Sequence, residues 1–385
     1  MALIFSLVFT ILMYFSQITL ATDFNFGSGQ AAKSENAKDA LITAMERSGD
    51  RIFAVGVHGI VIYSDDEGDS WTQAESVPYM NTITDISCPS IVLCWATGHD
   101  ATILHSNDGG KNWVVQYEDF DFDAPLLSIH MFDELNGVAV GAFALSLRTT
   151  NGGRSWGFLF VSEDDYQPHI NYTFSHGPLM GSASANLNGY AVGELGKFYL
   201  SPDKGLTWMT IDTGYEGSLW SGVMARPGLF FLLGMSGNIV IVEELDTELN
   251  DEPVVDAKTG FACYEGGRYD GNCKIFLFDY INTGVKNSLT HAVMLANASV
   301  AMSGNGGAVS TLDINSKRTI ETCVRSDRLS NTSIIQLKDG KISEIVINPN
   351  ELNINADKFE NLIGDDAKYN AIEELDQTIL PLYTL

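Results

Sequence analysis

Acidic side chains are the residues of this sequence most able to do chemistry. The chain has 49 Asp and Glu residues, and two suitably placed carboxylates can hydrolyse a glycosidic bond. Its 14 tyrosines also supply candidate nucleophiles. The seven histidines, His130 and His291 among them, form no pattern with Ser or Cys that would indicate nucleophilic catalysis. A glycan-acting hydrolase is therefore an alternative, and the spacing of the residues selects no catalytic residue.

Recognition of another molecule is the second kind of chemistry that the sequence indicates. Residues 117–123 and 163–169 each combine carboxylates with aromatic rings, which suits binding of a basic or amphipathic peptide. We predict a binding surface made of these stretches and of several short turns. Its candidate residues are His58, His99, Asp100, Tyr117, Asp119, Phe120, Asp121, Phe122, Asp123, Phe143, Asp165, Tyr166 and Glu194, and the same face would present Met235 and Asn305. The alternative is a set of solvated loops with a few aromatic rings packed between sheets.

A repeated hairpin motif must position these residues. Its four copies are residues 64–71, 106–113, 149–156 and 201–208, and their tryptophans follow one another at intervals of 42, 43 and 52 residues. Apolar runs flank the copies, as in Ile60–Tyr63 before the first, so each copy is predicted to join two strands. A repeat of about forty residues built from short strands is typical of a propeller blade.

The residue types of the motif are those that a tight turn requires. Asp or Asn accepts backbone N–H bonds within the turn, Gly tolerates a positive φ, and Trp supplies a large apolar side chain. We therefore interpret the motif as structural. Its residues are Ser64, Asp66, Gly68, Trp71, Ser106, Asp108, Gly110, Trp113, Thr149, Asn151, Gly153, Trp156, Ser201, Asp203, Gly205 and Trp208.

A Gly-x-x-Gly turn, or a near version of it, precedes each copy by about eight residues, at 56–59, 98–101, 141–144 and 193–196. The motif resembles the Asp-box, or BNR repeat, of sialidases, sortilin-type receptors and photosystem II stability/assembly-factor propellers. The two elements together are most similar to the photosystem II assembly-factor-like group, over residues 50–210. That resemblance implies a non-catalytic scaffold that binds a membrane protein or an exported polypeptide segment and aids its assembly or stability.

The sialidase side of the resemblance implies instead an exported glycoside hydrolase. Sialidases hold the carboxylate of their substrate with an arginine cluster. Lys and Arg together number only 22 here, and the usual Phe-Arg-Ile-Pro opening is absent. An assembly scaffold is therefore the expected function, and the hydrolase is the alternative.

The repeats predict an all-β fold, a propeller of four-stranded antiparallel blades. The first glycines of the turns fall at 56, 98, 141, 193, 234 and 304, and the last interval indicates an insertion within 245–290. Strands on either side of Asp339–Gly340 predict a further blade. We expect seven blades within residues 22–350, with six or eight as alternatives. Residues 351–385 are predicted to close the ring or to form an acidic tail.

Residues 1–21 have the character of a signal peptide. An apolar segment is followed by Thr19-x-Ala21, which predicts cleavage after Ala21 and a periplasmic or secreted protein. The alternative is an uncleaved N-terminal membrane anchor, because the segment has no Lys or Arg.

The charge of the chain limits its partners. The net charge of −27 repels phosphate backbones, so nucleic acid is not an expected partner. The resemblance to the assembly-factor group implies a protein partner. No cofactor and no metal site are expected, because the Asp-rich turns lack the ligand spacing of a calcium loop. The oligomeric state is not predicted.

The five cysteines fit an exported protein better than a metal site. Cys88 and Cys94 flank a predicted hairpin connection, and Cys263 and Cys273 bracket a Gly-rich loop, so each pair is a candidate disulfide. Cys323 is predicted to be a buried thiol.

Overall fold

Short antiparallel strands make up most of the regular structure. The computed structural model describes residues 29–122, 124–159, 168–175, 188–245, 259–262, 274–324, 331–338 and 342–346. The predicted signal peptide, the candidate pair Cys263 and Cys273, and the acidic C-terminal segment lie outside these residues.

The strands form sheets in chain order. The first sheet contains β1 (Ile42–Ser48), β2 (Arg51–Gly56), β3 (Val61–Ser64) and β4 (Thr72–Gln73). The second contains β5 (Ile83–Ser87), β6 (Cys94–Gly98), β7 (Ile103–Ser106) and β8 (Val114–Tyr117). The third contains β9 (Leu126–Met131), β10 (Gly137–Gly141), β11 (Ser146–Thr149) and β12 (Gly157–Phe158). The fourth contains β13 (Ile170–Ser175), β14 (Gly189–Gly193), β15 (Lys197–Ser201) and β16 (Met209–Asp212).

The last two large sheets continue this order. The fifth contains β17 (Leu219–Arg226), β18 (Leu229–Gly234), β19 (Asn238–Leu245), β21 (Lys274–Asn282) and β20 (Thr259–Ala262), in that order across the sheet. The sixth contains β22 (Leu289–Leu295), β23 (Ser299–Gly304), β24 (Ala308–Asp313) and β25 (Arg318–Val324). Single 3₁₀ turns are η1 (Ala37–Asp39), η2 (Val57–Gly59), η3 (Ala142–Ala144), η4 (Glu194–Gly196), η5 (Met235–Gly237) and η6 (Asn305–Gly307).

The prediction of seven blades is wrong. The described residues form six sheets of four or five antiparallel strands, so the propeller has six blades. The strands predicted for a seventh blade, β26 (Asn331–Gln336) and β27 (Ile342–Val346), form only a two-stranded ladder. The sequence could not separate a ladder from a blade, because both begin with the same alternating strands and tight turn.

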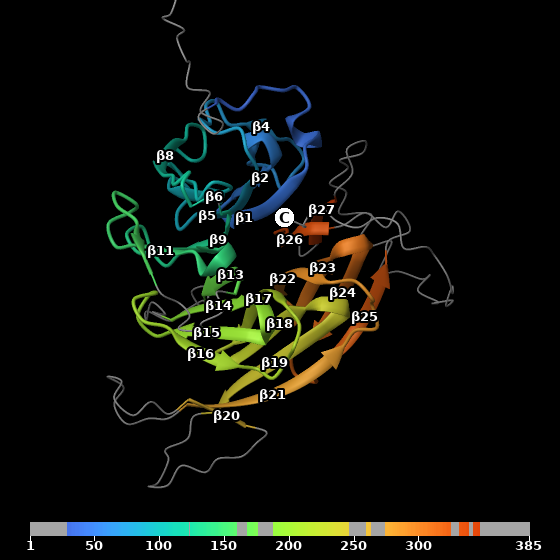
Figure 1. The fold of residues 1–385 in the computed structure, drawn as a ribbon. Coiled ribbons are helices and arrows are strands. Elements are labelled where there is room, and N and C mark those ends of the chain that lie inside the picture. The colour runs from blue at the N-terminus through green and yellow to red at the C-terminus, as the bar shows by residue number, and fades with distance from the viewer. Residues whose placement is uncertain are drawn as a thin grey trace, which may run out of the picture.

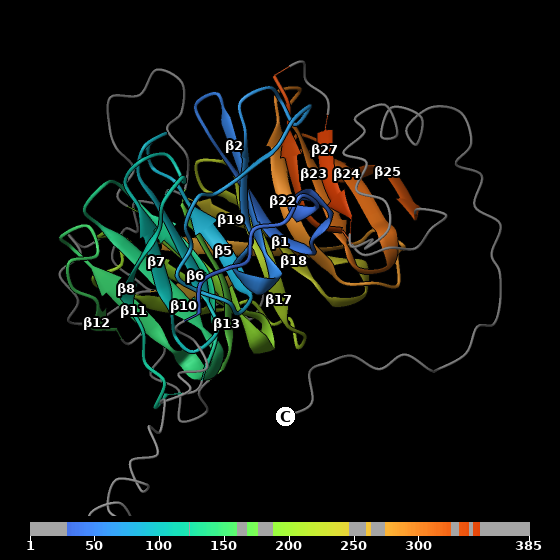
Figure 2. The same ribbon diagram turned by 90° about the horizontal axis from the view of Figure 1, so that it is seen from above.

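The first strand of each sheet lies on the inside of a ring. β1, β5, β9, β13, β17 and β22 pack against one another in succession, and β26 packs between β22 and β1. The sheets follow one another around the ring in Figure 1, and Figure 1 and Figure 2 both place the β26–β27 ladder beside the sixth sheet. The ladder thus fills the gap between the last sheet and the first.

Apolar side chains fill each interface between neighbouring sheets. Separate buried clusters join the first and second, second and third, third and fourth, fourth and fifth, and fifth and sixth sheets. Two smaller clusters join the β26–β27 ladder to the first and sixth sheets, through Ile335 and Ile334 respectively. Burial of each large side chain contributes about 2 kcal/mol, so the interfaces hold the ring together.

Glycines are required where a turn meets the preceding or following connection. A Cβ on Gly56 would collide with the carbonyl oxygen of Leu41, just before β1. Gly59 has a φ of +70°, and a Cβ there would collide with the carbonyl oxygen of Tyr79 in the connection to β5. Close approach and positive φ together explain the Gly-x-x-Gly turn.

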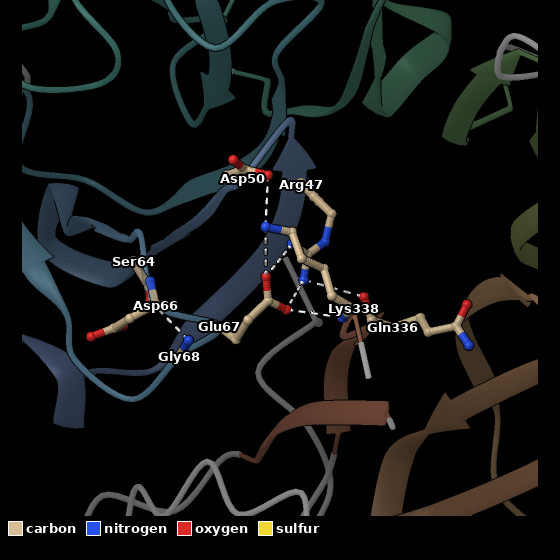
Figure 3. Close-up of polar contacts among 8 residues, drawn as sticks. All are labelled: Arg47, Asp50, Ser64, Asp66, Glu67, Gly68, Gln336 and Lys338. Atoms are coloured by element: carbon tan, nitrogen blue, oxygen red, sulfur yellow. Dashed lines mark hydrogen bonds and ion pairs between the residues drawn. The ribbon is translucent and has the colours of Figure 1, made fainter. Parts of the chain in front are cut away.

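The box residues hold the turn between the third and fourth strands of each of the first four sheets. In the first box, the Ser64 hydroxyl accepts the Gly68 N–H at 2.8 Å and donates to Asp66 at 2.8 Å (Figure 3). Asp66 then accepts the Ser70 N–H at 2.8 Å. The same network recurs around Ser106 and Asp108, Thr149 and Asn151, and Ser201 and Asp203. The hydroxyl and the Asp or Asn side chains of each box therefore make their hydrogen bonds within their own turn.

Glu67, in the first box, joins the first sheet to the β26–β27 ladder that closes the ring. It has a φ of +62°, and its carboxylate accepts two hydrogen bonds from the guanidinium of Arg47 in β1, at 2.9 and 2.7 Å (Figure 3). It also accepts the backbone N–H of Lys338, just after β26, at 3.0 Å. Arg47 in turn donates to the carbonyl oxygen of Gln336 at 3.3 Å. The hydrogen bonds from Arg47 lower the pKa of Glu67, so this carboxylate stays charged to a lower pH than an ordinary glutamate. We call the contacts of Glu67 with Arg47 and Lys338 the latch.

We expect Glu67→Gln to lower the free energy of unfolding by about 1–2 kcal/mol, because it removes the charge that holds Arg47 and Lys338 together. Hydrogen exchange should accelerate in β26 more than in β10 or β14. Asp65→Asn is the control, since Asp65 pairs with Arg51 inside one sheet and is mostly exposed. Equal acceleration in all sheets would contradict a local latch.

Candidate functional site: the turn face

One face of the ring carries the turns between second and third strands together with the connections between sheets. Backbone N–H groups in these turns donate to the following connection: Gly59 to Asn81 O, Ala144 to Pro168 O, Gly196 to Gly217 O and Gly237 to Asn287 O, at 2.8–2.9 Å. We call this the turn face. The boxes lie on the opposite face, the box face, where they bond to the hairpins between first and second strands, as Gly109 does to Val92 O.

The middle residue of each turn has left-handed backbone geometry. The φ values are +56° at His58, +56° at Asp100, +54° at Phe143, +55° at Leu195, +54° at Ser236 and +62° at Gly306. This geometry turns the side chain away from the sheet, and His58, Phe143, Leu195 and Ser236 are exposed. The turns of the first, third, fourth and fifth sheets therefore each present one exposed middle side chain on this face.

Two predicted residues, Phe143 of the third sheet and Glu194 of the fourth, both contact His169 in the connection between these sheets. The ring of Phe143 lies edge-on to His169, with centroids 5.0 Å apart. Glu194 accepts the backbone N–H of His169 at 3.0 Å, and its other oxygen lies 3.9 Å from His169 Nδ1. His169 thus links an exposed aromatic ring to a carboxylate.

The acidic and aromatic stretch after β8 lies beside the turn of the second sheet. The Asp119 N–H donates to the carbonyl oxygen of Asp100 at 3.3 Å, and Asp119 caps the N–H groups of Asp121 and Phe122 at 3.1 and 3.3 Å. Burial and the neighbouring Asp119 raise the pKa of Tyr117. The stretch is a folded loop with carboxylates on its surface.

The remaining predicted residues are spread around the face. Asp100 accepts the Asn81 amide at 2.6 Å, His99 is half-buried, and His58 lies on the first sheet, away from the third and fourth. Asp123, Asp165 and Tyr166 lie outside the described residues. In the part of the chain that the structure describes, no three His, Cys, Asp or Glu side chains are placed to hold a metal ion.

The inner wall of the ring holds titratable residues that the sequence did not identify. Tyr172 of the fourth sheet reaches His291 of the sixth, with ring centroids 6.4 Å apart, so both point toward the middle of the ring. Burial raises the pKa of Tyr172, and the charges of Asp85 and Glu46 raise it further. Residues from four sheets therefore share one interior, which only the ring closure brings together.

Burial dominates the protonation of these groups. It raises the pKa of Glu46 to about 8 and that of Asp85 to about 6, although Glu46 accepts the Cys88 N–H and Asp85 accepts the Ser128 hydroxyl. It lowers the pKa of His291 to about 4. Both carboxylates keep a partly exposed surface, so the shifts reflect enclosure by the ring rather than complete exclusion of water.

We expect Glu46→Gln to stabilise the protein at pH 8 by about 2 kcal/mol and to have little effect at pH 4.5. Folding favours protonated Glu46, so parental stability falls as pH rises from 4.5 toward 8, and the amide removes that loss. Denaturant unfolding at both pH values measures the difference. Glu134→Gln, at an exposed site on the box face, is the control, and a pH-independent gain from Glu46→Gln would refute the explanation.

The prediction of a disulfide between Cys88 and Cys94 is confirmed. Cys88 and Cys94 are joined in the hairpin between β5 and β6. Cys323 lies in β25.

A family model matches the part of the chain that contains the second and third sheets and the first three strands of the fourth. Residues 73–208, about a third of the chain, match the model described as photosynthesis system II assembly factor YCF48. The chain is a BNR-type β-propeller that resembles the photosystem II assembly-factor family. The resemblance inferred from the boxes and the Gly-x-x-Gly turns is thereby confirmed.

Solved propellers share the fold at low sequence identity. YCF48 from Cyanidioschyzon merolae is 14% identical, with 82% of this chain and 95% of that chain covered and a TM-score of 0.55. The Cps50 (Swd1) propeller domain of Myceliophteria thermophila is 10% identical, with 83% and 95% covered and a TM-score of 0.59. A structure of YCF48 bound to D1 peptide is 17% identical over 69% of this chain and 76% of that chain, and its TM-score of 0.48 is too low to support an argument.

A curated relative matches over a short segment. Anthranilate phosphoribosyltransferase of Pelagibacter ubique (strain HTCC1062) is 66% identical over 47 residues, which are 12% of this chain and 14% of that protein. The chain thus spans about a seventh of the length of that relative, and no activity is inferred from the match. Within the described ranges, no helix is long and apolar enough to cross a membrane.

Proposed function

We propose that the protein is an exported, non-catalytic scaffold that binds a segment of a membrane protein or of an exported polypeptide and aids its assembly or stability. The observation that supports this most is a turn face that carries exposed carboxylates and apolar side chains on an assembly-factor-like propeller. Polypeptides with Lys or Arg beside apolar residues complement such a face.

The pairing of the arginines argues against the alternative function, a glycan hydrolase. A sialidase-like site needs arginines that converge on a substrate carboxylate. Here Arg47 binds Glu67, Arg51 binds Asp65 and Arg226 binds Glu243, each within or beside its own sheet. These guanidinium groups already have carboxylate partners of the chain itself.

Affinity capture from the membrane fraction of the source organism tests the proposed function. We expect the full chain to retain a polypeptide. The double variant Glu118→Lys with Asp121→Lys should retain at least tenfold less of that polypeptide than the parent does. Asp69→Lys with Glu134→Lys makes the same charge change on the box face and is the matched control. The proposed function would be contradicted if no polypeptide were retained, or if both double variants retained as much polypeptide as the parent.

Mass spectrometry of the exported protein tests the expected start at Thr22.

A further inference from the structure

Exposed apolar side chains form an arc on the turn face over three consecutive sheets. Phe143 belongs to the third sheet, Leu195 to the fourth, and Met235 and Trp220 to the fifth. Their exposed fractions are 54%, 51%, 43% and 38%. We call these four residues the apolar arc. Phe143 and Leu195 are the middle residues of their turns, whereas Met235 is the first residue of its turn, before Ser236. The turns of the second and sixth sheets have Asp100 and Gly306 at their middle positions.

The backbone geometry of Phe143 and Leu195 argues that these two apolar side chains of the arc have a role outside the fold. Positive φ is uncommon for bulky residues, and Asp, Asn or Gly normally occupy such positions, as Asp100 and Gly306 do. Phe143 and Leu195 accept this unfavourable geometry and remain about half exposed, so their side chains gain little from burial in return. Backbone strain that is not offset by burial of the side chain indicates a function at that site.

Trp220 occupies a position that joins neighbouring sheets in β5 and β13, and that Leu127 occupies in β9. Each first strand has an irregularity after its first residue, and the extra residue there is Thr84 in β5 and Asn171 in β13. Thr84 donates to the carbonyl oxygen of Leu126 at 2.6 Å, and Asn171 donates to that of Leu219 at 2.8 Å. In β17 the extra residue is Trp220, whose large ring is partly exposed. Tryptophan is enriched among the residues that contribute most of the binding energy at protein interfaces.

The charges around the arc define its partner. Glu194 and Glu216 lie in the fourth turn and in the connection that follows it. Lys197 is bound to Asp212 at 3.5 Å, and Lys286 is an exposed cation in the connection after the fifth sheet. We propose that the apolar arc docks a polypeptide segment whose apolar side chains are flanked by Lys or Arg. The assignment rests on the proposed function and names its site and the chemistry of its partner. A second copy of this chain fits less well, because the net charge of −27 would oppose another acidic surface.

Asparagine substitutions separate a binding role from a structural one. Asn tolerates positive φ, so Phe143→Asn and Leu195→Asn should leave the unfolding midpoint unchanged or raise it by about 1–2 °C. Both should weaken partner binding at least tenfold, whereas Phe143→Leu and Leu195→Met should retain it. Ala298→Asn, at a φ of +59° on the box face, and Ile320→Ser, an exposed apolar residue of β25, are the controls.

The probe for these measurements comes from photo-crosslinking. A photoreactive phenylalanine analogue at position 143 or 195 of the full chain, irradiated with the membrane fraction, should attach to a segment whose sequence is basic and apolar. That segment is then synthesised as a peptide, and its affinity for each variant is measured, beside a charge-reversed peptide that should not bind.

The outcomes separate the arc from the proposed function. Crosslinks at position 320 but not at 143 or 195, with normal binding by the Asn variants, would overturn the arc and leave the proposed function standing. Crosslinks only to lipid or to an acidic segment would overturn the assigned partner, and crosslinks only to a second copy would assign the arc to self-association. Absence of any captured polypeptide at every site would overturn both proposals.

Discussion

Gly59→Ala is expected to lower the free energy of unfolding by about 3 kcal/mol, although it adds one methyl group. Alanine at the φ of +70° costs about 1 kcal/mol. The added Cβ would also collide with the carbonyl oxygen of Tyr79, which belongs to the main chain and cannot swing aside as a side chain does. The connection to β5 must then move, and the hydrogen bond from Gly59 to Asn81 weakens with it. Urea unfolding, with the slope compared as well as the midpoint, measures the loss.

The chain supplies its own control for this prediction. Ala101 and Ala144 occupy the equivalent positions in the second and third sheets, with φ of +49° and +54°. Their connections already accommodate a methyl group, so Ala144→Gly should change stability by no more than about 1 kcal/mol. Similar losses from Gly59→Ala and Ala144→Gly would show that the collision with the connection does not set the cost.

The fold was predictable because its signals are local. Ser64, Asp66 and Gly68 stabilise one turn through bonds among residues at most four positions apart, so the pattern is visible without a structure. Such a pattern reports that a hairpin exists and repeats. It does not report how many strands each repeat assembles, which is why the predicted seventh blade proved to be a ladder.

The functional face was predictable only in part, because its composition depends on contacts between sheets. The antiparallel order predicts that turns and connections share a face, and the hydrogen bond from Ala144 to Pro168 joins two such segments. Trp220 has no local signal, since only strand register shows that its position is equivalent to those of Thr84 and Asn171. Glu46 likewise meets Cys88 and Asp85 only after the first and second sheets have packed together.

The largest stability loss is expected from Phe230→Ala, at about 4 kcal/mol. Phe230 is fully buried in β18, and its ring lies 4.7 Å from that of Tyr190 and 5.2 Å from that of Phe198, both in the fourth sheet. The substitution removes the two ring contacts of Phe230 with the fourth sheet and leaves a cavity in the interface between the fourth and fifth sheets. Thermal and urea unfolding measure the loss, and Phe230→Leu should cost roughly a third as much.

Phe230→Ala also tests whether the two sheets act as one binding platform. Leu195 projects from the fourth sheet and Met235 from the fifth, so the interface around Phe230 fixes the distance between them. If a partner spans both residues, then at a temperature where the variant remains folded its affinity should fall modestly, about three- to tenfold, because the platform has lost its rigid spacing. An unchanged affinity beside a large stability loss would mean that the partner contacts one sheet only. A stability loss below about 1 kcal/mol would mean that the sheets close around the missing ring, contrary to the packing described above.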